Sequence, residues 1–165
     1  MDKRALEHEI LDILCEDART PVDKIAAMLG EEKGDIKAAI GRMEDKGIII
    51  KYRALVDHEK VESNLVEAWI EVRVIPQMGD GFDAIAEKIY RYNEVKSMYL
   101  MSGAYDFMVR VEGTTLQSVA SFVSSKLSVI EGVQSTATHF LLKVYKSDGV
   151  VLHTKGGDNR LVVSP

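Results

Sequence analysis

Apolar residues in the N-terminal third of the chain recur at intervals of three and four, a spacing typical of amphipathic helices. The first stripe ends near a turn at residues 17–19, the second at Gly30 and the third at Gly47. Thr20 and Pro21 offer an N-cap and a first-turn proline for the second helix. The stripes are Leu6, Ile10, Ile13 and Leu14; Ile25, Ala26 and Leu29; and Ile36, Ile40 and Met43. With a basic-aromatic strand expected at residues 51–53, this order predicts a winged helix-turn-helix over residues 1–56.

From Val66 the apolar period changes to two, which indicates a half-buried strand with Trp69 on its second face. Further periodic segments predict a helix, strands at 98–102 and 105–111 joined at Gly103, a second helix and a last strand. The second helix carries an apolar face of Leu116, Val119, Ala120, Val123, Leu127 and Ile130, and the last strand spans 136–145. The order β-α-β-β-α-β is that of a ferredoxin-like fold, whose helices cover one face of the sheet and leave the other open.

The predicted fold class is therefore α+β, with a winged helix-turn-helix followed by a ferredoxin-like domain at 65–146. A polar linker at 57–64 separates the two periodic regimes. Residues 147–165 hold apolar runs at 150–152 and 161–163, which we interpret as a loose hairpin or an arm that reaches a partner.

Composition excludes several classes of protein. The 165 residues are 46% apolar and 28% charged, ordinary values for a globular chain. No apolar run is long enough to span a membrane, so we expect a cytoplasmic protein without a membrane partner. The four histidines lack metal-ligand spacing, so no metal is predicted, and Cys15 is interpreted as a semi-buried core thiol.

The charge of the chain bears on a DNA-binding function. The net charge is −5, and residues 1–56 hold 10 Lys and Arg against 12 Asp and Glu. Because phosphate contacts supply much of the affinity for nucleic acid, an acidic domain must gather its cations on one face and bind in several copies. Oligomerisation is expected on this ground alone.

The third helix carries the candidate DNA contacts. A rotation of about 100° per residue sends Ala38 and Gly41 outward, where small side chains permit close approach to a groove. Cationic neighbours would contact phosphates or base edges, although an ordinary solvated helix face explains the same pattern. The full set of predicted DNA-binding residues is Arg19, Lys33, Lys37, Ala38, Gly41, Arg42, Lys51, Tyr52 and Arg53. The last three are equally a solvated strand edge, and Arg19 bonds either a backbone carbonyl or a phosphate.

Several motifs in this order resemble the leucine-responsive/asparagine-responsive (Lrp/AsnC) family of transcriptional regulators over nearly the whole chain. The motifs are Ile13-Leu14, Asp17-Ala18-Arg19, Leu29-Gly30, residues 42–49, residues 102–107 and Thr136-Ala137-Thr138. Two positions depart from the family pattern, since Glu32 replaces the usual Ser cap of the recognition helix and Ala39 a frequent Arg. The resemblance implies double-stranded DNA as a partner and a homodimer that assembles further to a tetramer or octamer.

The resemblance also implies a small-molecule effector, an amino acid or related metabolite, bound around the 102–106 turn at contacts between dimers. A positive φ at Gly103 would free backbone N–H groups for an α-carboxylate, and Asp106 would pair an α-ammonium. The predicted effector residues are Met101, Ser102, Gly103, Ala104, Tyr105, Asp106, Thr136 and Thr138. On sequence alone, a plain hairpin turn explains Gly103 and Asp106 as well.

We therefore predict a sequence-specific DNA-binding transcriptional regulator whose assembly responds to a small metabolite, without a cofactor. The alternative is an oligomeric metabolite sensor whose acidic helix-turn-helix no longer binds DNA. An enzyme is not expected, because the sequence lacks a phosphate loop, a nucleophile elbow and a zinc-protease motif.

Overall fold

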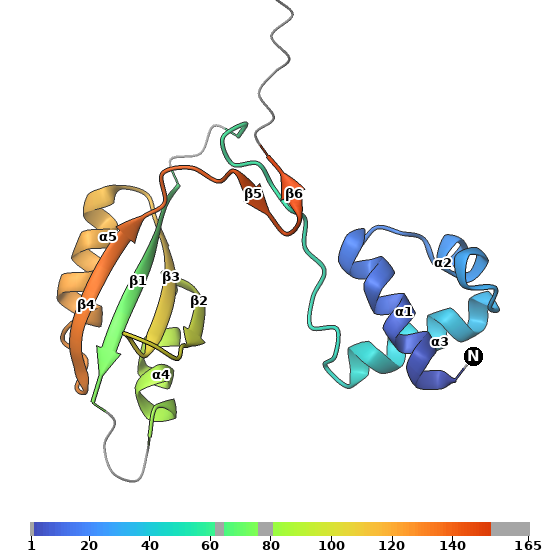
Figure 1. Cartoon of the computed structure of the whole chain (residues 1–165), viewed down its shortest axis with the longest axis horizontal. Coiled ribbons are helices and arrows are strands. Elements are labelled where there is room, and N and C mark those ends of the chain that lie inside the picture. The colour runs from blue at the N-terminus through green and yellow to red at the C-terminus, as the bar shows by residue number, and fades with distance from the viewer. Residues whose placement is uncertain (1, 62–64, 76–80, 153–165) are drawn as a thin grey trace, which may run out of the picture. The chain divides into compact units, whose positions relative to one another are not determined.

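A computed structural model describes residues 2–61, 65–75 and 81–152. The chain divides into two compact units, Met1–Val56 and Asp57–Pro165, and each is described by itself (Figure 1). None of the described helices is long and apolar enough to cross a membrane.

The first unit is built from three helices, as predicted: α1 (Lys3–Glu16), α2 (Val22–Leu29) and α3 (Lys33–Asp45). Their apolar stripes meet in one core whose fully buried side chains include Ile10, Ile25 and Met43. Gly30 ends α2 in the left-handed conformation with φ 67°, which favours glycine and turns the chain sharply into α3. The core also contains Ala39, so an arginine at this position would point into the core instead of toward DNA.

Three details of the first unit differ from the sequence-based expectations. Pro21, not Thr20, is the N-cap residue of α2, because Val22 is the first residue with helical geometry. Cys15 is exposed, since the buried stripe of α1 is confined to Leu6 and Ile10. The strand expected at residues 51–53 does not form within the described part of the chain. A strand needs backbone groups paired in a ladder over several residues, and the described residues 51–53 are not part of one.

The second unit is the predicted ferredoxin-like fold. Four strands form one antiparallel sheet in the order β2-β3-β1-β4, with β1 in a central position (Figure 1). The elements are β1 (Val66–Val74), α4 (Asp83–Tyr90), β2 (Val95–Leu100), β3 (Phe107–Gly113), α5 (Leu116–Phe122), the π-helical turn η1 (Val123–Leu127) and β4 (Val133–Phe140).

The two faces of this sheet have different environments. Alternate residues of β1, namely Ala68, Ile70 and Val72, are fully buried against a core that includes side chains of α4, α5 and η1. On the opposite face the indole of Trp69 stacks on Tyr99, with ring centroids 6.4 Å apart. The prediction of one helix-covered face and one face without helices is confirmed.

The open face also carries two polar clusters. The Arg110 guanidinium contacts Glu67 Oε2 at 2.7 Å and Glu112 Oε1 at 2.8 Å. The hydrogen bond to Glu67 raises the pKa of Arg110. His139 Nε2 lies 3.2 Å from Glu71 Oε1. These polar side chains surround the aromatic pair on the open face.

Strand ends in the second unit differ from the prediction because tertiary pairing sets them. β2 spans Val95–Leu100 instead of 98–102, since Val95 already pairs with Val111. β4 spans Val133–Phe140, where Phe140 pairs with Ala68 of β1, and one further bond joins the Leu141 N–H to the Glu67 carbonyl.

The second helix is also shorter than the sequence pattern predicts. Leu116 is 58% exposed, since the Thr115 and Ser118 capping box fixes a first turn that directs Val119 and Phe122 inward. Ile130 lies beyond the end of η1.

A small hairpin follows the sheet. β5 (Lys146–Ser147) pairs with β6 (Val150–Val151) around Asp148 and Gly149, both of which have positive φ. A hairpin in the expected tail region therefore forms around this turn and includes part of the first apolar run. The second run, 161–163, lies outside the described residues.

Candidate DNA-binding and effector surfaces

The outer face of α3 is open and lined by small residues. Lys37 and Ala38 are exposed, and a Cβ built at Gly34 or Gly41 would meet no atom within 4 Å. A surface of this kind lets another molecule approach the helix backbone closely, as insertion into a DNA groove requires.

Two of the predicted cationic contacts on α3 are held by carboxylates of the other two helices. The Lys33 ammonium lies 2.6 Å from Asp23 Oδ1 of α2. The Arg42 guanidinium donates to Glu7 Oε1 of α1 from Nη2 at 3.2 Å and from Nε at 3.4 Å. The side chains of Arg42 and Glu7 are 42% and 21% exposed, so the Arg42 pair is partly desolvated.

The remaining DNA candidates lie outside α3. Arg19 is exposed beside α1, and its backbone N–H donates to Asp17 Oδ1 at 2.9 Å. Lys51, Tyr52 and Arg53 are exposed in a segment without secondary structure. The Tyr52 hydroxyl donates to Glu44 Oε1 at 2.9 Å, and partial burial together with this contact raises the pKa of Tyr52. Tyr52 therefore links the segment to the C-terminal end of α3.

The predicted effector turn connects β2 to β3. Gly103 has φ 146°, the positive value expected from the sequence. Met101, Ser102, Ala104 and Tyr105 complete the turn, and Tyr105 is half-buried. Among the described residues, no acceptor is bonded to the backbone N–H groups of Ser102, Gly103 and Ala104. These groups are available to an anion.

Asp106 has a structural role that the sequence did not indicate. Its Oδ2 accepts a hydrogen bond from the Val74 N–H at 2.8 Å, and its own N–H donates to the Val72 carbonyl at 3.0 Å. Its carbonyl accepts from the Met101 N–H at 2.8 Å. One carboxylate oxygen is thus committed to the end of β1, which leaves Oδ1 for a ligand.

The other two effector candidates are not brought to this turn within one chain. Thr136 and Val72 are paired, and Val72 also pairs with Phe107, so β1 separates Thr136 from the β2–β3 turn. Thr138 lies opposite Ile70, two residues further along β4 than Thr136. Thr136 Oγ1 lies 3.3 Å from Ser128 Oγ, beside the helix layer.

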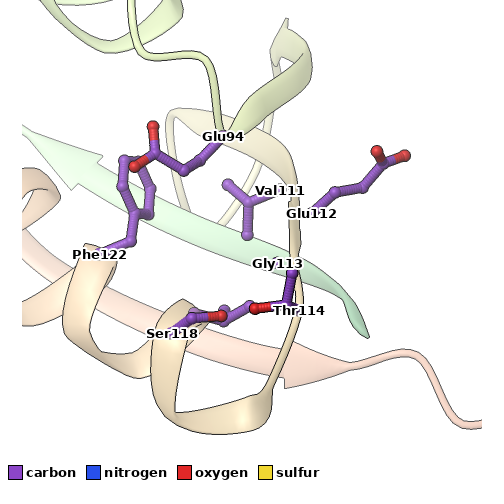
Figure 2. A pocket seen from close by; sticks show the side chains of 8 residues that line it. Glu94, Val111, Glu112, Gly113, Thr114, Ser118 and Phe122 are labelled. Carbon is purple, nitrogen blue, oxygen red and sulfur yellow. The ribbon is translucent and has the colours of Figure 1, made fainter. Parts of the chain in front are cut away.

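A cavity of about 230 Å³ lies elsewhere in this unit, and none of the predicted effector residues lines it. Its apolar walls are Val111, Val119 and Phe122, and Glu94 lies at its rim (Figure 2). Glu112 lines it as well, although its carboxylate points away from the Phe122 ring (Figure 2).

The Glu94 carboxylate at this rim is paired. Lys126 Nζ donates to Glu94 Oε1 at 2.6 Å and lies over the rings of Tyr92 and Phe122. The hydrogen bond from Lys126 is the main reason why the pKa of Glu94 is lowered. Sequence reasoning missed this pair and the carboxylates of Glu7 and Asp23, because no local pattern links residues so far apart in the chain.

Two known protein families match successive parts of the chain. Residues 3–50 match a winged helix-turn-helix DNA-binding family, and residues 67–151 match the Lrp/AsnC ligand binding domain family. The chain belongs to the Lrp/AsnC family. It is a transcriptional regulator that joins a helix-turn-helix DNA-binding domain to a ligand-binding domain.

One sequence relative and two solved structures are similar to this chain. YugG, an HTH-type transcriptional regulator of Bacillus subtilis, is 48% identical over 160 residues, which is 96% of either chain. A transcriptional regulator of Neisseria meningitidis, solved in complex with L-Met, is 25% identical with a TM-score of 0.69. That match covers 86% of this chain and 91% of the other. The structure of Escherichia coli AsnC, at 22% identity and a TM-score of 0.67 over 87% and 94% of the chains, shares the fold.

Proposed function

We propose that this Lrp/AsnC regulator binds DNA with the outer face of α3 and responds to an amino acid at the β2–β3 turn. The open face of α3, with two glycines and exposed Lys37, is the observation that supports the first half of the proposal. Lys51, Tyr52, Arg53 and Arg19 would add phosphate contacts at its margins. We propose that the protein acts in the cytoplasm, where its DNA lies.

The chemistry of the β2–β3 turn supports the second half. Backbone N–H groups around Gly103 suit an α-carboxylate, and Asp106 Oδ1 suits an α-ammonium. One zwitterion has both groups, and the Neisseria regulator was solved with such a molecule, L-Met. Because Thr136 and Thr138 lie across β1 from this turn, they would contact the effector from a second copy of the chain.

We further propose that the chain forms a homodimer through the open face of its sheet, and that dimers assemble further. Trp69, Tyr99 and the cluster around Arg110 supply a face with both aromatic and charged contacts. Two copies of an acidic DNA-binding unit double the number of phosphate contacts, which compensates for the weak binding of each. An effector between dimers would then favour one assembly over another.

Fluorescence anisotropy with DNA from upstream of the gene, against a scrambled duplex and across a salt series, tests this function. We expect binding that prefers the native fragment and weakens steeply with salt, and a shift in that binding with one or more amino acids. Absence of binding at low salt would instead favour the alternative of an oligomeric metabolite sensor that no longer binds DNA.

A further inference from the structure

The cations of α3 are not equally available to DNA. Lys37 is exposed, whereas Lys33 and Arg42 each contact a carboxylate from another helix of the same unit. Glu7 lies on α1 and Asp23 on α2, so both carboxylates come from elements that pack against α3. A carboxylate that receives the N–H groups of a guanidinium occupies the same donors that a phosphate would use.

The Arg42–Glu7 pair would compete with DNA more strongly than the Lys33–Asp23 pair. Two of its nitrogens, Nε and Nη2, point to the same oxygen of Glu7, and Glu7 is only 21% exposed. The Lys33–Asp23 pair is more exposed on both sides, so solvent screens it more. The Nε and Nη2 edge of Arg42 becomes free for a phosphate only after the guanidinium leaves Glu7, and the carboxylate that is left behind then repels the DNA backbone.

We propose that Glu7, and more weakly Asp23, compete with DNA phosphates for Arg42 and Lys33, and so determine how tightly the regulator binds. The inference rests on the proposed DNA-binding role of α3. The competition weakens binding to every duplex, because phosphate contacts carry no sequence information. The two carboxylates therefore lower the affinity for specific and for non-specific DNA by the same factor.

The test is the affinity of the full-length Glu7→Gln variant for the native fragment and for a scrambled duplex. Because a partly exposed surface ion pair is typically worth about 1 kcal/mol or less, we expect each affinity to rise about two- to fivefold for every helix-turn-helix unit that contacts the DNA. Glu9→Gln removes the same charge from an exposed position of α1 and is the matched control. Glu9→Gln should raise the affinity for DNA clearly less than Glu7→Gln does.

A double-mutant cycle separates release of Arg42 from a general loss of negative charge. Arg42→Gln should weaken binding, and Glu7→Gln added to Arg42→Gln should recover little, since no guanidinium remains to be released. Glu7→Asp keeps the charge but shortens the side chain, and it should give part of the gain. Thermal unfolding of each variant controls for loss of the α1–α3 contact.

The outcomes are distinguishable. A gain that survives in the Arg42→Gln background, or that Glu9→Gln matches, overturns the inference. Failure of the unmodified protein to bind any DNA at low salt overturns the proposed function and the inference together. Binding by the unmodified protein without a gain in Glu7→Gln overturns the inference alone.

Discussion

At the scale of single residues, Asp106 combines a structural and a proposed binding role that two substitutions can separate. Asp106→Ala leaves the part-buried Val74 N–H without its acceptor, so we expect it to lower the free energy of unfolding by about 1–3 kcal/mol. Asp106→Asn keeps an oxygen for Val74 but removes the charge, and should cost less than about 1 kcal/mol. Urea unfolding measures both values.

The same pair of variants tests the effector site. If Asp106 pairs an α-ammonium, Asp106→Asn retains its fold and its DNA affinity but loses the shift that an amino acid produces in anisotropy. An unchanged response in this stable variant would remove Asp106 from the site, and Asp106→Ala alone could not make that distinction.

The pair of Glu94 and Lys126 predicts a dependence of stability on pH. Because the folded-state pKa of Glu94 is lowered, the pair stabilises the fold above the ordinary pKa of 4.5, and the contribution is lost as pH falls through the lowered value. Both side chains are partly exposed, so Glu94→Gln should cost about 0.2–1 kcal/mol at neutral pH. The difference from the unmodified protein should vanish in acid, as chemical unfolding across a pH series will reveal. A difference that persists in acid would assign the loss to packing.

At the scale of elements, α3 contains two glycines, Gly34 and Gly41, although glycine destabilises a helix relative to alanine. Gly41 has helical geometry and room for a methyl group, so Gly41→Ala should raise the free energy of unfolding by about 0.5–1 kcal/mol. If α3 enters the groove closely, the same methyl should weaken DNA binding. The stability gain is an internal control, because weaker binding by a more stable protein cannot result from unfolding. Unchanged affinity would place this face of α3 away from DNA.

The elements that the sequence predicted well are those determined by local periodicity. The three helical stripes and the alternation of β1 each follow from apolar spacing within one segment. The misplaced strand ends depend on pairing between distant segments: β2 begins at Val95 because Val95 pairs with Val111, and residues 51–53 form no strand within the described part of the chain. The candidate site divides in the same way, since the positive φ of Gly103 is local whereas the Glu7–Arg42 contact joins residues 35 positions apart.

At the scale of the whole molecule, the proposed assembly depends on the open face of the sheet. Ala137 is exposed on β4 and lies opposite Glu71, so Ala137→Arg places a long cation on this face beside a carboxylate that accepts it. The fold should therefore persist, while a second sheet can no longer pack closely. Light scattering after size exclusion should give multiples of 18.4 kDa for the unmodified protein and a shift toward 18.4 kDa for the variant.

Assembly and DNA binding should then fall together. A single head contacts fewer phosphates than a pair, so Ala137→Arg should bind the native fragment more weakly and with a shallower dependence on salt. Gln117→Arg adds the same side chain at an exposed position of α5, on the helix-covered side, and this variant should retain both the larger mass and the steep salt dependence. If Ala137→Arg remained oligomeric, the copies would have to join through another surface. If it became monomeric without loss of affinity, the acidic helix-turn-helix would bind DNA without help from a second copy, and charge would cease to be the reason for assembly.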